Sequence, residues 1–204
     1  MTKEEKQKQE AAERGYKALY NAYVVGRKGG PEFLAWLEST DFFVAPASTR
    51  FHGAYPGGLA EHSAAVCQAL MALRDELEPA AKDAREERAA ACSAVLVALV
   101  HDICKADYYK ESTRRQKNPE GKWEDVRSYT VREDALPLGH GEKSLYLAAK
   151  FFDLTDEEAA AIRWHMGAYC DHDRYREMGQ AYDRYPLALL VHGADMIATH
   201  RWGK

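Results

Sequence analysis

The sequence predicts an all-α protein, a helical bundle with one β-hairpin inserted at about residues 108–131. Several segments place apolar residues three and four positions apart, which is the spacing of one face of a helix. One segment breaks that pattern, because an Asn-Pro-Glu-Gly turn separates two polar runs, the second of which ends in the β-favouring Tyr129, Thr130 and Val131. We therefore expect helices throughout, interrupted once by two antiparallel strands.

The length predicts a single domain over residues 1–204, since this is enough chain for one well-buried core and short for two. We divide it into an N-terminal helical extension, residues 1–40, and a core that carries the sequence motifs, residues 50–198. Hydrophobic residues make up 46% and charged residues 29%, as in an ordinary globular protein.

The formal charge of -4 gives no general attraction to nucleic acid or to anionic membrane, so binding of a polyanion must be local. The polar start MTKEEKQKQE does not resemble a secretory signal, and no apolar run reaches the roughly 18 residues of a membrane span. The cysteines show no CxxC spacing, which argues against a zinc ribbon. We expect a cytoplasmic protein that does not bind membranes, and the sequence leaves its oligomeric state open.

The first 58 residues predict two helices and a loop. A turn-rich break at residues 26–31 ends a charged, amphipathic first helix, and Pro31 then opens a short helix over residues 31–39. Residues 40–58 contain too many Pro and Gly for regular structure, so we expect a structured loop.

Two helices with polar residues on apolar faces should follow. The first runs from about Leu59 to Leu77 and turns His62 toward the core. The second spans roughly residues 88–103, is apolar nearly all round, and carries His101 and Asp102 at its C-terminal end.

The last third of the chain predicts two more helices of this kind. Thr155 and Glu158 form a capping box that opens a helix whose apolar stripe includes His165. Another helix begins at about Pro186 and carries Asp195 among apolar neighbours. Residues 171–185, between them, are expected to form a loop.

Residues that bind metals in proteins thus recur in apolar segments. A lone histidine on an apolar stripe is usually a hydrogen-bonded core residue, and Asp195 alone could join two helices. Together these side chains would need several independent buried polar networks, whereas one or two divalent ions would satisfy them at once. The candidate ligands are His62, His101, Asp102, His140, His165 and Asp195.

Mixed imidazole and carboxylate ligands suit borderline divalent ions such as Mn, Fe, Co, Ni or Zn, and no thiolate favours zinc. Neighbours on a helix point about 100° apart, so His101 and Asp102 can both reach one site only where the helix ends. There the aspartate can bridge two metals or orient a water. A metal that acidifies this water and polarises a phosphoryl oxygen provides the chemistry of phosphate-ester hydrolysis.

The ordered motifs resemble those of the HD-domain metal-dependent phosphohydrolases, whose pattern is H…HD…H…H…D. The chain looks most like the HD domain of bacterial 3'→5' exoribonucleases and related small bacterial and phage hydrolases, over about residues 50–198. Any one motif is weak, and the ordered set is specific. The matching stretches are PGGLAEH ending at His62, HDICK at 101–105, GHGEKS at 139–144, WHMG at 164–167 and HGADMIA at 192–198.

The resemblance implies one or two divalent ions among Mn, Fe, Ni, Co, Zn and Mg. It implies that a first metal is bound by His62, His101, Asp102 and Asp195. His140 and His165 would hold a second metal or contact the scissile phosphate. Met166 stands where the exoribonuclease subgroup often has a second histidine, which puts a full two-metal site in question.

The resemblance also implies substrate contacts. Lys105 matches the lysine of HD-x-x-K and would stabilise charge on a phosphoryl oxygen or protonate the leaving group; the alternative is an exposed lysine near a helix C-terminus. The other expected contacts are His52, Tyr55 and Lys143, with Arg174 and Arg176 covering the substrate from the 171–185 loop. No role is assigned to His172, His192 or His200, although His192 lies one turn before Asp195.

The expected activity is hydrolysis of a phosphate ester or anhydride by metal-activated water, with Asp102, Lys105, His140 and His165 as catalytic residues. A small phosphorylated substrate, such as a nucleotide, is favoured because the single-strand-binding barrel found beside this domain in the exonucleases is missing. The basic, aromatic hairpin is the one candidate platform for a strand, and it could equally be solvated. The alternatives are a 3'→5' exonuclease acting on short single strands and a non-catalytic nucleotide-binding regulator.

Overall fold

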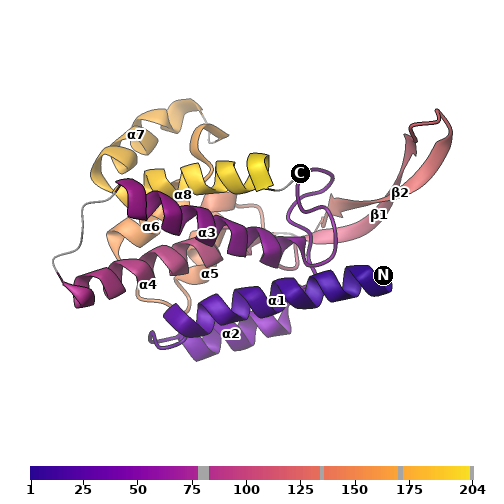
Figure 1. Cartoon of the computed structure of the whole chain (residues 1–204). Coiled ribbons are helices and arrows are strands. Elements are labelled where there is room, and N and C mark those ends of the chain that lie inside the picture. Colours follow the sequence, from indigo (N-terminus) through magenta and orange to yellow (C-terminus); the bar gives the residue numbers. More distant parts are fainter. Residues whose placement is uncertain (78–82, 134–135, 170–171, 203–204) are drawn as a thin grey trace.

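The structure is a computed structural model that describes residues 1–77, 83–133, 136–169 and 172–202. Within these residues the chain forms eight α-helices and one antiparallel β-hairpin, joined by loops and short helical turns (Figure 1). The expected mainly helical architecture with an inserted hairpin is confirmed. The helices are α1 (Lys3–Tyr23), α2 (Gly30–Ser39), α3 (Gly58–Leu77), α4 (Ala84–Val100), α5 (His140–Ala148), α6 (Asp156–Trp164), α7 (Tyr175–Arg184) and α8 (Pro186–Ile197).

The core forms around α3 and α4. Helix α3 packs against α1, α4 and α8, while α6 packs against α5 and α8. The last seven residues of α4, Ala94–Val100, are all buried, as expected from their apolar composition. Figure 1 shows α1 and α2 along one flank of the bundle. Tyr16 of α1 ties that flank to the core through a hydrogen bond from its hydroxyl to the Leu99 carbonyl.

The hairpin consists of β1 (Tyr109–Lys117) and β2 (Trp123–Val131), nine residues each, paired from Tyr109 opposite Val131 to Lys117 opposite Trp123. The turn at Asn118–Gly121 is closed by the Asn118 side chain, which accepts from the backbone N–H groups of Glu120 and Lys122. The predicted hairpin is therefore confirmed.

The loop expected before α3 is confirmed, since residues 40–57 contain no helix or strand. Backbone hydrogen bonds hold it against the helix that follows, including one from the Leu59 N–H to the Ala45 carbonyl. Its other side approaches the hairpin, where the Tyr129 N–H donates to the Thr49 carbonyl.

Two sequence expectations about secondary structure were wrong. The helix expected at 88–103 begins at Ala84, because the Asp83 side chain caps it by accepting from two backbone N–H groups, and it ends at Val100. Ile103–Lys105 then form a separate 3-10 turn. The loop expected at 171–185 is instead helical from Tyr175 to Arg184, with residue 171 outside the described residues.

Helix α7 was missed because its polar side chains conceal a narrow apolar stripe. Met178, Ala181 and Tyr182 are the less exposed residues of that stripe, and the Tyr182 hydroxyl donates to the Trp164 carbonyl. Helix α5, which the motif GHGEKS opens, was not assigned from sequence. None of the helices in the described ranges is both long and apolar enough to cross a membrane.

Candidate metal centre

Five of the six candidate ligands converge from four separate helices. His62 lies one turn into α3, His101 and Asp102 follow the last residue of α4, His165 follows the last residue of α6, and Asp195 lies on α8. The three histidines and Asp102 are almost fully buried, and 17% of the Asp195 side chain is exposed. Packing of α3 against α4 and α8 brings together residues up to 133 positions apart in the sequence.

The ligand atoms of His62, His101 and Asp195 all lie within 4.8 Å of one another, a spacing at which a shared metal ion can be held. His62 Nε2 lies 3.1 Å from Asp195 Oδ1, in a geometry that does not form a hydrogen bond. Asp102 lies beside this group, with its Oδ2 3.4 Å from His101 Nε2 and 3.8 Å from His62 Nε2.

Backbone hydrogen bonds fix the tautomers of two of these histidines. His101 Nδ1 lies 2.8 Å from the Ala98 carbonyl oxygen, and His165 Nδ1 lies 2.8 Å from the Ile162 carbonyl oxygen. A carbonyl can only accept, so both Nδ1 atoms carry a proton, and the neutral form of each ring has its lone pair on Nε2. Hydrogen bonds of this kind, from the ring nitrogen that faces away from the metal, orient metal-binding histidines in proteins.

The inward-facing atoms have no hydrogen-bond partner within the described residues. Buried polar atoms are normally satisfied, so each orphan needs an explanation. Four of the six unsatisfied buried side-chain atoms in the described part of the chain gather at this place, and their donor chemistry of imidazole nitrogen and carboxylate oxygen fits a divalent cation. They are Nε2 of His62, His101 and His165 and Oδ1 of Asp102.

The charges of the site also fit a cation. Burial would raise the pKa of Asp195, yet His62 and His101 hold it below its usual range, so this carboxylate stays ionised. Burial lowers the pKa of His62, which keeps its ring neutral. For His101 the effect of burial is outweighed by Asp102 and Asp195, and its pKa is raised.

Lys105 is buried and bonded to Asp102, which excludes the alternative of an exposed lysine. Its Nζ donates a 2.6 Å hydrogen bond to Asp102 Oδ2 from one turn further along the chain. Burial lowers the pKa of Lys105, but the Asp102 carboxylate more than compensates and leaves it above its usual value. Lysine and histidines together hold the pKa of Asp102 well below its usual range despite its burial.

His140 is the first residue of α5 and lies beside Cys104. Its Nδ1 is 3.2 Å from the Cys104 sulfur, whose pKa burial raises to about 12, so the thiol stays protonated. Lys143, one turn along α5, is buried with its Nζ 4.6 Å from the centre of the Tyr108 ring. Burial lowers the pKa of both His140 and Lys143.

An open cavity of about 810 Å³ lies above the cluster and exposes part of it. Asp102, Asp195, Lys105 and His140 reach its surface. The cavity is lined by Ala47, Ser48, Thr49, Phe51, His52, Asp102, Lys105, Tyr109, His140, Met166, Tyr169, His192, Asp195, Met196, Thr199 and His200.

Of the other residues expected to contact substrate, His52 lines the large cavity, whereas Tyr55, Arg174 and Arg176 do not. His52 lines the cavity, its ring centre lies 4.9 Å from that of His62, and burial lowers its pKa to about 4. Tyr55 lines a separate small cavity behind His62, where its hydroxyl donates to Glu61. Arg174 is exposed, forms an ion pair with Glu177 and does not line the large cavity, and Arg176 is exposed on α7.

The structure adds cavity residues to which the sequence gave no role. Phe51 and Tyr169 are large aromatics that line the cavity while remaining 70% and 74% exposed. Phe51 adjoins His52, and Tyr169 follows His165 by four residues. Their proximity in the sequence to predicted site residues is the signal by which Phe51 and Tyr169 could have been predicted. His192 also lines the cavity, with its Nδ1 2.8 Å from the His165 carbonyl oxygen.

Comparisons of the chain with protein-family models, with curated proteins and with solved structures find no match.

Proposed function

We propose that this protein is an HD-type, divalent-metal-dependent phosphohydrolase that acts on a small phosphorylated substrate such as a nucleotide. One observation carries the proposal. Three buried imidazole Nε2 atoms and one carboxylate oxygen lack partners beside Asp102 and Asp195, which line an open cavity of about 810 Å³. Unsatisfied groups of this kind, beside a cavity large enough for a nucleotide, suit a site that binds a metal and then a substrate.

In this proposal His62, His101, Asp102 and Asp195 hold the first ion. The chemistry that such an ion supplies when bound is a lower pKa for a coordinated water and polarisation of a phosphoryl oxygen. His165 Nε2 faces Asp102 Oδ1 at 3.6 Å, and His140 reaches the cavity from α5, so these two residues hold a second ion or the scissile phosphate.

Lys105 stabilises negative charge on the transferred phosphoryl group. It is held by its hydrogen bond to Asp102 and lines the cavity, so its ammonium is fixed before substrate arrives. Because the Asp102 carboxylate keeps the pKa of Lys105 high, this lysine acts as a fixed positive charge. Protonation of the leaving group would have to come from water, since burial lowers the pKa of His140 and keeps its ring neutral.

The cavity favours a substrate with both a phosphate and a ring. Its floor is polar and carries the Lys105 ammonium beside the Asp102 and Asp195 carboxylates, whereas Phe51, Tyr169, Met166 and Met196 give it apolar walls. Flat aromatic side chains at a cavity mouth suit stacking on a nucleobase. A 3'→5' exonuclease acting on a short single strand is the alternative that the same walls support.

The experiment begins with purified protein stripped by chelation and reloaded separately with Mn, Fe, Co, Ni, Zn or Mg. Each form is assayed against nucleoside mono-, di- and triphosphates, cyclic dinucleotides, labelled oligonucleotides and an aryl phosphodiester. We expect metal-dependent phosphate release from a nucleotide, with at least a 100-fold loss in Asp102→Asn and in Asp195→Asn. Asp75→Asn, an exposed change on α3, is the matched control and should keep full activity.

Each other outcome identifies a different function. Stepwise shortening of the oligonucleotide would favour the exonuclease. Tight nucleotide binding without turnover in any metal would replace the enzyme with a non-catalytic regulator. Failure to bind any divalent ion, with no change in stability on chelation, would refute the metal centre itself.

A further inference from the structure

The hairpin is an arm that extends beyond the helical bundle. Figure 1 shows β1 and β2 running out from the bundle to a free tip. Nine residues in each strand give it a length of about 30 Å. The two strands pair only with each other within the described sheet, and most of their side chains are exposed. Burial of an apolar core does not account for an arm of this length, which indicates a role in contact with another molecule.

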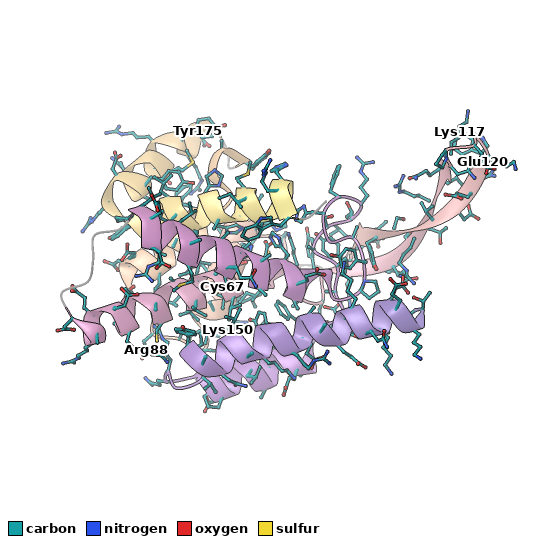
Figure 2. The ribbon with its side chains drawn as sticks, viewed as in Figure 1. Cys67, Arg88, Lys117, Glu120, Lys150 and Tyr175 are labelled. Atoms are coloured by element: carbon teal, nitrogen blue, oxygen red, sulfur yellow. The ribbon has the colours of Figure 1, made fainter. Side chains whose placement is uncertain are left out.

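The tip of the arm carries a small excess of positive charge. Residues 114–126, the two strand ends and the turn between them, contain four Lys or Arg against three Asp or Glu, in a chain whose net charge is -4. Figure 2 shows side chains radiating from the tip, where Lys117 and Glu120 are labelled. The tip is therefore a local site of attraction for a polyanion on a protein that as a whole repels one.

Much of that charge is not neutralised within the protein. Lys110, Arg114 and Lys117 have no carboxylate partner among the described residues. Arg115 lies 3.8 Å from Asp125 and Lys122 lies 3.1 Å from Glu120, but both pairs are exposed and so are weak. These cations can therefore bind phosphates without first breaking a strong ion pair.

An exposed tryptophan lies among the cations. Trp123 is 59% exposed at the start of β2, and its ring is flanked by the Arg115 guanidinium at 5.8 Å and the Lys117 ammonium at 5.4 Å. Tyr129, at the base of the same strand, is by contrast buried. An exposed aromatic ring beside two cations is the combination that stacks on a base and binds the adjoining phosphates.

The arm leads to the cavity of the candidate metal centre. Tyr109, the first residue of β1, lines that cavity and also lines a groove of about 590 Å³ at the base of the arm. Lys110 and Arg132 line the same groove, together with Glu133. Cationic side chains thus recur from the tip to the cavity wall, which suits a linear polyanion better than a flat membrane surface.

We propose that the arm binds single-stranded nucleic acid, with a base stacked on Trp123 and phosphates contacted by Arg114, Arg115 and Lys117. Exposed base faces are available in a single strand, whereas a duplex hides them. The proposal goes beyond the proposed hydrolase function and does not depend on it, because the arm can bind a strand whether or not the cavity cleaves it.

The test is fluorescence anisotropy of labelled 15-nucleotide oligothymidine and oligouridine with the full-length protein, in EDTA so that no metal-dependent cleavage occurs. We expect Trp123→Ala to weaken binding about 5- to 100-fold, the range for loss of one stacked base. We expect Arg115→Ala/Lys117→Ala to weaken binding and to reduce the slope of log K against log salt by about 1.4, because two phosphate contacts are lost.

Matched variants control for general effects of charge and aromatic content. Trp202→Ala removes another exposed tryptophan, and Lys28→Ala/Lys150→Ala removes two exposed cations from the bundle (Lys150 is labelled in Figure 2). Both should bind like the wild type. Thermal unfolding should be unchanged in the arm variants, since their side chains are exposed.

Three results would overturn the proposal. These are no binding by the wild type at 50 mM salt, arm variants that bind like the wild type, or a duplex bound more tightly than either single strand. A fourth result would replace nucleic acid with a membrane surface as the partner of the arm. This result is Trp123-dependent binding to phosphatidylserine vesicles together with no binding of the oligonucleotides.

Discussion

His192 donates a hydrogen bond from Nδ1 to the carbonyl oxygen of His165, 2.8 Å away, and so links α8 to the turn that carries a candidate metal ligand. Its ring stacks on Tyr182 and lies directly against Gly167. Gly167 has a φ of +56°, and a Cβ there would lie 2.3 Å from the His192 ring. The turn after α6 therefore depends on a residue without a side chain at this position.

We predict that Gly167→Ala lowers the free energy of unfolding by about 2 kcal/mol or more, because alanine is strained at positive φ and its Cβ displaces His192. Displacement of His192 should also shift His165 and weaken metal binding by roughly tenfold. Urea unfolding and calorimetric metal titration measure the two effects. Gly179→Ala is the control, since a Cβ there meets nothing within 4 Å and alanine should stabilise α7 by about 0.5–1 kcal/mol. Equal effects at the two glycines would contradict this account.

The Lys105–Asp102 pair predicts a stability change that depends on metal. Lys105→Met leaves the buried Asp102 carboxylate without its closest cation, which should cost about 3–5 kcal/mol in metal-free protein. A bound divalent ion replaces that positive charge, so the loss should shrink when the protein is saturated with Mn. Urea unfolding in EDTA and in Mn measures the difference.

Lys143→Met is the matched control for that variant. Lys143 is also buried, but its Nζ faces the Tyr108 ring and no carboxylate pairs with it among the described residues. Its replacement should change stability little, with or without metal. A loss of several kcal/mol at Lys143, or a loss at Lys105 that metal does not reduce, would show that charge pairing with Asp102 is not the cause.

The exposed aromatics of the cavity predict an effect on substrate affinity. Tyr169→Ala removes an exposed ring that lines the cavity and is not a candidate ligand, so KM for a nucleotide should rise about tenfold while kcat stays within about twofold. Glycerol phosphate, which has no ring, should show no such rise. Tyr146→Ala, an exposed tyrosine outside the cavity, is the control. A fall in kcat with unchanged KM would remove Tyr169 from substrate binding.

We expect the free energy of unfolding to depend on pH through Glu158, a buried residue outside the candidate metal centre. Its buried carboxylate accepts from the Arg27 guanidinium, from the Ser93 hydroxyl at 2.7 Å and from the Thr155 N–H at 3.0 Å. Burial would raise its pKa, but these bonds together lower it. Because the folded pKa lies below the unfolded value, the stabilisation is fully present at neutral pH and is lost as the pH falls through the folded pKa.

Glu158→Gln should therefore destabilise the protein at pH 7 by roughly 2–4 kcal/mol, the cost of breaking a buried ion pair. The difference from the wild type should narrow as the pH falls through the folded pKa of Glu158, which lies below the usual value for glutamate. Urea midpoints across this pH range measure the change. Asp153→Asn breaks the exposed pair with Lys28 and should have little effect at any pH. A difference that persists unchanged in acid would exclude this role for Glu158.

The sequence by itself determined the local elements with clear signals. Apolar spacing predicted α3 and α8, the Thr155–Glu158 capping box marked the start of α6, and the Asn-Pro-Glu-Gly turn predicted the hairpin. Residue type alone also selected His62, His101, Asp102, His165 and Asp195, since polar groups in apolar segments need a partner. Helix periodicity and turn chemistry act over a few residues, so they can be read without knowing the fold.

Only the tertiary structure decided which of those groups meet and which atoms remain without partners. Packing of α3, α4, α6 and α8 brought the Nε2 atoms together, buried Lys105 against Asp102, and left Arg174 outside the cavity. It also put Phe51 and Tyr169 on the cavity wall, a position that no local pattern marks. The physical reason is that a metal or substrate site depends on distances between residues more than 100 positions apart, which side-chain packing sets and sequence spacing does not.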